Sequence, residues 1–169
     1  HLFLVNLVEH IQPNTPVMSS IDILINFGHL LLIINCVVFF KNHRRINSKA
    51  FSIFTYYLLV ILIIQLVSKV LRSYKINNIY LSHFYFIGQF LFLSFFFKNL
   101  LLNPLQKKAT SIGLIIVLIP LVVYYSLYPD NYYKFNAFEI AITSLPLMIY
   151  SFLFFIQKME GSDRKFIYI

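Results

Sequence analysis

Cysteine is nearly absent from this chain, and its scarcity excludes several kinds of chemistry. Cys36 is the single cysteine in 169 residues. A disulfide within the chain, a zinc site built from cysteines and a thiol–disulfide exchange pair each need at least two cysteines. All three are therefore excluded within one chain, and the cysteine content does not reveal the redox compartment.

Charged residues are also scarce. They make up 12% of the chain, and only six of them are acidic. A soluble domain typically carries about 25% charged residues, and one with so much Leu, Ile and Phe would expose large apolar patches to water. The net charge of +8 comes from Lys and Arg at the ends of apolar runs and not along one amphipathic face. A soluble fold is excluded, and nucleic acid is not expected as a partner.

The usual catalytic motifs are missing as well. The chain has no H-E-x-x-H zinc motif, no G-x-S-x-G nucleophile motif and no P-loop. Every lysine lies near the end of an apolar run, where it could not hold a retinal at mid-depth. His29 and His83 differ by about 7 Å in expected depth, which disfavours a bis-histidine haem. We therefore predict no metal and no cofactor, and we favour a protein that is not an enzyme.

Long apolar runs are what the chain has in abundance. A helix needs about 20 apolar residues to cross about 30 Å of hydrocarbon, and five runs approach that length. We therefore predict an all-α, polytopic transmembrane helical bundle that forms a single domain over residues 1–169. The predicted spans are residues 21–40, 50–70, 79–97, 111–128 and 137–156.

The two ends of the chain predict that this bundle is part of a larger one. The chain begins at His1 without a methionine, and its first apolar stretch is too short to span a bilayer. After a polar stretch it becomes apolar again at Phe166. We expect an incomplete chain, with a further span beginning near Phe166.

The basic residues predict an orientation. Ten of the 14 Lys and Arg residues follow the first, third or fifth run. By the positive-inside rule the N-terminus lies outside and the C-terminal end lies in the cytoplasm of a bacterium, whose inner membrane is the expected location. An organellar membrane is the alternative. Tyrosines, which favour membrane interfaces, gather at the predicted outer end: Tyr74, Tyr80, Tyr124, Tyr125, Tyr128, Tyr132 and Tyr133.

A basic tract follows the first run. It contains Lys41, Arg44 and Arg45. Clusters of this kind either fix the topology of the loop or bind the headgroups of anionic lipids. We favour the first role and keep lipid headgroup binding as a hypothesis.

A few polar residues interrupt the apolar runs. Each ionisable group in hydrocarbon costs about 2.5 to 3.5 kcal/mol, so such groups are candidates for function. Asp22, Asn26 and His29 share one face of the first span. His83 and Glu139 lie at similar expected depths in the third and fifth spans. We hypothesise that these five residues form a ligand or proton site near the outer surface. The alternative is that they are interfacial acids at helix N-termini and histidines that serve packing.

Parts of the chain resemble a known family. These parts are residues 77–85 (NNIYLSHFY), 89–94 (QFLFLS) and 135–144 (FNAFEIAITS). Over about residues 50–169 the chain resembles uncharacterised integral membrane proteins of Bacteroidota that have about seven helices. Gln89 stands where that family often has a glutamate. The resemblance implies a similar architecture with about two more helices after Phe166, and it implies no activity.

Three functions stay open, and we favour the first. The first is a non-enzymatic subunit of a larger membrane assembly, whose partners are the lipid bilayer and other membrane proteins. The second is a small sensor or transporter that uses the polar residues of the spans. The third is an intramembrane enzyme that acts on lipid through the same groups.

Overall fold

The computed structural model describes the backbone of residues 17–166 and the side chains of residues 23–160. The Asp22 side chain and any span beyond Phe166 lie outside these ranges. The helices are α2 (Val17–His43), α3 (Lys49–Ser73), α4 (Tyr80–Leu100), α5 (Pro104–Leu127) and α6 (Ala137–Phe166), with a short 3-10 helix η1 (Pro129–Tyr133) before α6. Five of these helices contain stretches long and apolar enough to cross a membrane. The predicted class, a polytopic helical membrane protein, is confirmed.

Helix α5 begins earlier than the apolar pattern indicates. It starts at Pro104 and not near residue 111, because the Asn103 side chain accepts a hydrogen bond from the Leu105 backbone N–H at 2.9 Å. Asparagine before proline is a favourable helix start, since proline at the first helical position loses no hydrogen bond. Hydropathy detects only the apolar part of a helix, so it missed the polar first turn.

The connection between α3 and α4 fixes where α4 starts. Lys75 has a positive φ of 58°, which ends α3 in the left-handed conformation. The buried Asn78 side chain then donates hydrogen bonds to the Ser68 carbonyl oxygen at 3.2 Å and to its hydroxyl at 2.7 Å. These contacts hold the first turn of α4 against the end of α3, and His83 lies in that part of α4.

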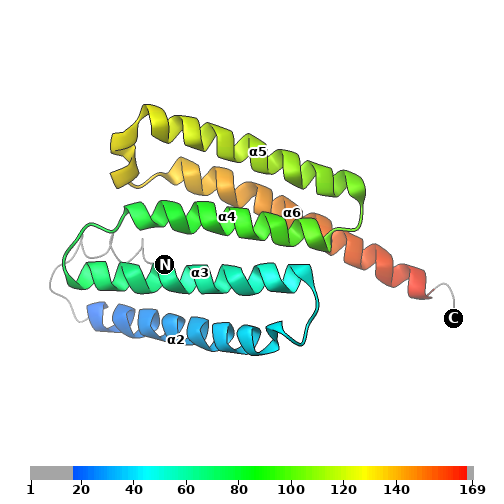
Figure 1. Ribbon diagram of the computed structural model, residues 1–169, viewed down its shortest axis with the longest axis horizontal. Helices are drawn as coiled ribbons and strands as arrows, with labels where there is room; N and C mark the ends of the chain where they lie inside the picture. Colours follow the sequence, from blue (N-terminus) through cyan, green and yellow to red (C-terminus); the bar gives the residue numbers. More distant parts are fainter. Residues whose placement is uncertain (1–16, 167–169) are drawn as a thin grey trace.

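The helices form an open row and not a closed ring (Figure 1). Helix α2 packs along α3, α3 packs along α4, and α4 contacts both α5 and α6, which also contact each other. Helix α4 therefore lies at the centre of the row. Its two sides face two different helix pairs, α2 with α3 and α5 with α6.

The apolar core lies between α4, α5 and α6. Its buried members are Phe90, Leu114, Val117, Leu121 and Tyr150. Because lipid tails are as apolar as leucine, this core is held by close packing more than by expulsion of water. Most other large apolar side chains are exposed on the outside of the bundle, as a lipid-facing surface requires.

Candidate functional site

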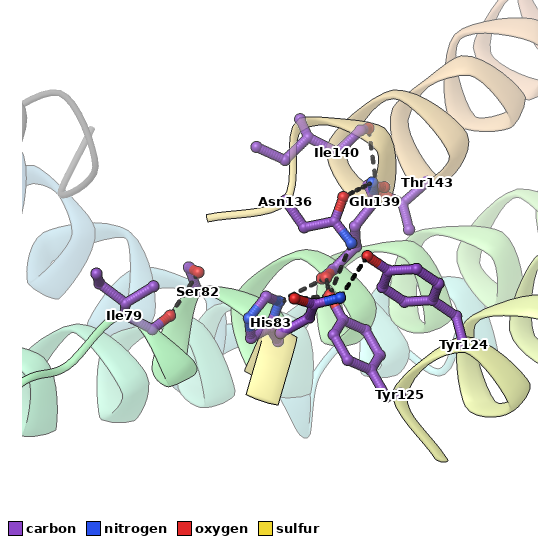
Figure 2. Close-up of polar contacts among 10 residues, drawn as sticks. Ile79, Ser82, His83, Tyr124, Tyr125, Asn136, Glu139, Ile140 and Thr143 are labelled. Atoms are coloured by element: carbon purple, nitrogen blue, oxygen red, sulfur yellow. Dashed lines mark hydrogen bonds and ion pairs between the residues drawn. The ribbon is translucent and has the colours of Figure 1, made fainter. Parts of the chain in front are cut away.

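His83 on α4 and Glu139 on α6 meet inside the bundle (Figure 2). Their side chains are 2% and 0% exposed, and His83 Nδ1 lies 2.5 Å from Glu139 Oε2. The imidazole N–H donates to the carboxylate, so each group satisfies a polar atom of the other. The sequence placed these residues at similar depth, and the structure brings them into direct contact.

Tyr125 on α5 is the third member of this site. Its hydroxyl donates to Glu139 Oε2 and lies 2.9 Å from His83 Nδ1. We expected Tyr125 to belong to the interfacial belt of tyrosines, but the structure turns its hydroxyl into the bundle. Nothing in the sequence indicates this direction, because the neighbouring Tyr124 has the same chemistry at nearly the same depth.

Asn136 joins the start of α6 to the phenol of Tyr125. Its side-chain oxygen accepts the Glu139 backbone N–H at 3.2 Å, and its amide nitrogen donates to the Tyr125 hydroxyl at 3.2 Å. Asparagine is among the best residues for capping a helix N-terminus. One side chain therefore starts α6 and orients Tyr125, a role that the sequence hypothesis did not assign to it.

Tyr132 on η1 packs against the site from the end of the bundle. Its ring centroid lies 5.2 Å from that of His83 and 5.6 Å from that of Tyr125. Burial raises the pKa of the Tyr132 phenol, and the nearby Glu139 carboxylate raises this pKa further, with smaller contributions from other tyrosines. Tyr132 therefore stays protonated at neutral pH and presents an uncharged ring to His83.

Two polar atoms of the site keep unused hydrogen-bonding capacity. Within the part of the chain that the structure describes, Glu139 Oε1 and His83 Nε2 are buried and have no hydrogen-bond partner. A buried polar atom without a partner costs about 1 to 3 kcal/mol, so such atoms call for an explanation. Glu139 Oε1 can accept a proton or a hydrogen bond, whereas His83 Nε2 accepts a hydrogen bond when unprotonated and donates one when protonated. The site therefore has two buried atoms that keep unused hydrogen-bonding capacity.

The remaining predicted residues lie elsewhere. Asn26 accepts a hydrogen bond from Lys69 Nζ at 3.0 Å, and His29 donates its Nδ1–H to the Ile25 carbonyl at 2.7 Å. Both belong to the α2–α3 side of the row, where α3 and α4 separate them from α6. Of the five residues that we expected in one cluster, the four with described side chains therefore lie in two regions.

The basic tract lies at the opposite end of the bundle from Tyr132. Lys41 is in the last turn of α2, and Arg44 and Arg45 follow in the connection to α3. All three side chains are exposed. Cations in the last turn of a helix favour its negative end, which helps to stabilise α2.

Comparison with known proteins gives no relative for this fold or this site. No family model, no curated protein and no solved structure matches the chain. The class is shown by the molecule itself, because five helices of the described chain have the length and apolar character of membrane spans. The chain is therefore an integral membrane protein of the polytopic helical class.

Proposed function

We propose that this integral membrane protein is a small sensor or transporter that works through Glu139, His83 and Tyr125. The observation that carries the proposal is the carboxyl group of Glu139, which is 0% exposed and contacts side chains from two other helices. Ionisable groups inside a membrane protein usually belong to ion pathways, proton relays or ligand sites. Simple packing would be served as well by apolar residues of similar volume.

Proton binding gives the site a way to change the structure. A Glu139 carboxylate beside a protonated His83 is neutral overall, and so is a protonated Glu139 beside a neutral His83. One added proton leaves a net positive charge in a buried place, which is unfavourable there. Tyr125 takes part in proton binding because its hydroxyl donates to the same oxygen of Glu139. Tyr132 places an uncharged phenol beside the His83 ring. Protonation should therefore shift α4, α5 and α6 relative to one another.

The site belongs, in this proposal, to the outer leaflet of a bacterial inner membrane. Support comes from the basic residues, because Arg44 and Arg45 lie at the other end of the bundle, which the positive-inside rule places in the cytoplasm. Protons or ligands from outside would then arrive beside Tyr132. Glycosylation or thiol-labelling scans of the α3–α4 and α2–α3 connections test this orientation.

Infrared difference spectroscopy tests whether Glu139 binds a proton. The purified protein is placed in lipid nanodiscs, and its spectra are recorded at a series of pH values with the carboxyl C=O stretch as the readout. We expect a carboxyl band that changes with pH and disappears in Glu139→Gln. The matched control is Glu160→Gln, which removes an exposed carboxyl group from the same helix. A pH-dependent spectrum that is identical in wild type and Glu139→Gln contradicts the proposal.

Proton flux distinguishes a transporter from a sensor. Proteoliposomes that enclose a pH-sensitive dye are given an outward or inward proton gradient. A transporter accelerates the decay of the gradient, and Glu139→Gln abolishes the acceleration while Glu160→Gln does not. A sensor shows no flux, but it shows a pH-dependent change in helix contacts that Glu139→Gln removes. Turnover of added phospholipid that is lost in Glu139→Gln would instead indicate the lipid-acting enzyme.

We also propose, as a second candidate, a subunit of a larger membrane assembly. It is favoured by the position of α2 at the edge of the open row (Figure 1), with its large apolar side chains exposed. Such a face can be covered by lipid or by a neighbouring membrane protein. The exposed members include Ile23, Leu24, Phe27, Leu30, Ile34 and Val37.

Purification in mild detergent at natural expression level tests this candidate. A subunit co-purifies with a membrane protein at fixed stoichiometry, and Leu24→Trp on α2 lowers the recovery of that protein. Ile116→Trp is the matched control, because Ile116 is equally apolar and exposed but lies on α5. Equal recovery with both variants, or recovery of the chain alone, counts against a partner on α2.

A further inference from the structure

A second polar region lies on the other side of α4, between α2, α3 and α4. It is a cavity of about 360 Å³. Its polar lining consists of His29 and Asn35 from α2, Tyr57 and Gln65 from α3, and Tyr85 from α4. The other lining residues are aliphatic, apart from one glycine. The wall of the cavity therefore combines polar and apolar side chains.

His29 supplies a buried acceptor to this region. The side chain is 9% exposed, and its Nδ1–H donates to the Ile25 carbonyl. This bond places the proton on Nδ1, so Nε2 carries a free lone pair. Nε2 has no hydrogen-bond partner among the residues that the structure describes. A neutral imidazole nitrogen in this position accepts an O–H or N–H donor.

Three further polar groups of the cavity are available. The hydroxyls of Tyr57 and Tyr85 and the side-chain amide of Gln65 make no hydrogen bond to the described part of the chain. These three groups are partly accessible, so a molecule in the cavity can reach them. Ligand sites commonly combine an apolar wall with a few such convergent polar groups.

The lining also decides what charge a ligand can carry. It contains no Asp, Glu, Lys or Arg. A charged molecule would therefore lose its hydration without gaining a counter-charge, which is strongly unfavourable. An uncharged molecule with an apolar body loses little hydration free energy on entering the cavity. Its single donor is satisfied by His29 Nε2. The volume lies within the range of small-molecule sites, which is about 300 to 1,000 Å³.

We infer that this cavity is a binding site for a small, uncharged, amphipathic molecule that donates an O–H or N–H group to His29 Nε2. The molecule enters from the bilayer, because Gly28 and Leu31 line the cavity and are exposed on the surface of α2. The site is separate from Glu139 and from the function proposed above. Its chemistry is recognition of a lipid-permeable molecule and not proton binding.

Indole is a suitable probe for this site. It is uncharged and has a single N–H donor, and 1-methylindole has nearly the same shape without that donor. The chain contains no tryptophan, so indole fluorescence excited at wavelengths that its 12 tyrosines do not absorb reports the probe in detergent micelles without background from the protein. We expect saturable binding above the partition into empty micelles, with indole about tenfold tighter than 1-methylindole, the usual effect of one hydrogen bond to a buried acceptor.

Two variants test whether indole binds in this cavity. Gly28→Leu fills it, and a Cβ at Gly28 meets nothing within 4 Å, so the change is tolerated. Gly88→Leu is the matched control, since its Cβ is equally free and Gly88 does not line the cavity. We expect Gly28→Leu to weaken indole binding about tenfold or more and Gly88→Leu to leave it unchanged.

His29→Phe tests the acceptor without filling the cavity. It should reduce the preference for indole over 1-methylindole to within about twofold. Glu139→Gln should leave indole binding unchanged, which separates this site from the proposed function. The inference is overturned if neither probe binds saturably, if wild type binds both probes equally, or if Gly28→Leu binds indole as wild type does.

Discussion

His83 and Tyr85 are separated by one residue on α4, and they face opposite interiors of the bundle. His83 contacts Glu139 of α6, whereas Tyr85 lines the cavity shared with His29 of α2. Positions two apart on an α-helix point about 200° from each other, which accounts for this division. Helix α4 therefore forms one wall of both polar regions, and any rotation of α4 about its axis moves both.

Loss of the Glu139 carboxyl group should destabilise the fold. Glu139→Ala leaves the His83 N–H and the Tyr125 hydroxyl without their acceptor in a buried place. We expect the free energy of unfolding in mixed micelles to fall by about 1 to 3 kcal/mol. Glu160→Ala, at an exposed position of the same helix, should change it by less than about 0.5 kcal/mol.

A double-mutant cycle measures the coupling within this pair. His83→Ala combined with Glu139→Ala removes both partners, so the double variant should lose less stability than the two single losses added together. We expect a coupling of about 0.5 to 3 kcal/mol. Simple additivity would show that the contact between His83 and Glu139 contributes nothing to stability.

Asn136 should affect both the start of α6 and the Tyr125 phenol. Asn136→Ala removes the helix cap and the hydrogen bond to the Tyr125 hydroxyl, which should lower the unfolding free energy by about 0.5 to 2 kcal/mol. Asn136→Ser keeps a good cap and loses only the amide donor. If capping dominates, serine recovers most of the lost stability in thermal unfolding. If serine is as damaging as alanine, the bond to Tyr125 is the larger contribution.

Gly113 is where α5 allows a close approach of α6. A Cβ at this position would collide with the hydroxyl of Tyr150, which is 5% exposed and belongs to the core. We expect Gly113→Ala to lower the unfolding free energy by about 1 to 3 kcal/mol because the tyrosine must move. Gly88→Ala should leave stability equal or higher, since its Cβ meets nothing within 4 Å and alanine favours helix. Equal effects of the two changes would show that Tyr150 moves without cost.

Tyr132 should make stability depend on alkaline pH. Its raised pKa means that the folded protein holds the phenolic proton more tightly than the unfolded chain, whose tyrosines ionise near about pH 10. The stabilisation that Tyr132 contributes is complete below about pH 10. It is lost as the pH rises towards the pKa of Tyr132 in the folded protein. Above about pH 10 the melting temperature of wild type should therefore fall more steeply with pH than that of Tyr132→Phe. Tyr74→Phe, at an exposed tyrosine, is the control and should follow wild type.

The predicted spans were close to the observed helices except where polar residues continue a helix. The first turn of α5 is the clearest case, because Gln106, Lys107 and Lys108 are polar and still helical. Such residues lie at the membrane interface, where a helix needs no apolar side chains. Hydropathy therefore finds the part of a helix in lipid and misses its ends.

The candidate site was predicted only in part. His83 and Glu139 could be named from their charge inside apolar runs, but Tyr125 and Asn136 could not. Tyrosine and asparagine are ordinary residues at a membrane interface, so their inward direction leaves no trace in the sequence. His29 was assigned to the wrong neighbours for a related reason, since depth alone does not say which helices are adjacent.

The sequence by itself determined the class of this protein and the place of each polar residue along its apolar run. Apolar runs of this length must be helical in a bilayer, because lipid offers the backbone no hydrogen-bond partner. Only the tertiary structure decided that His83 meets Glu139 and that His29 faces a separate cavity. Side chains that face lipid and side chains that face a neighbouring helix are equally apolar here, so the order of the helices follows from packing between whole surfaces.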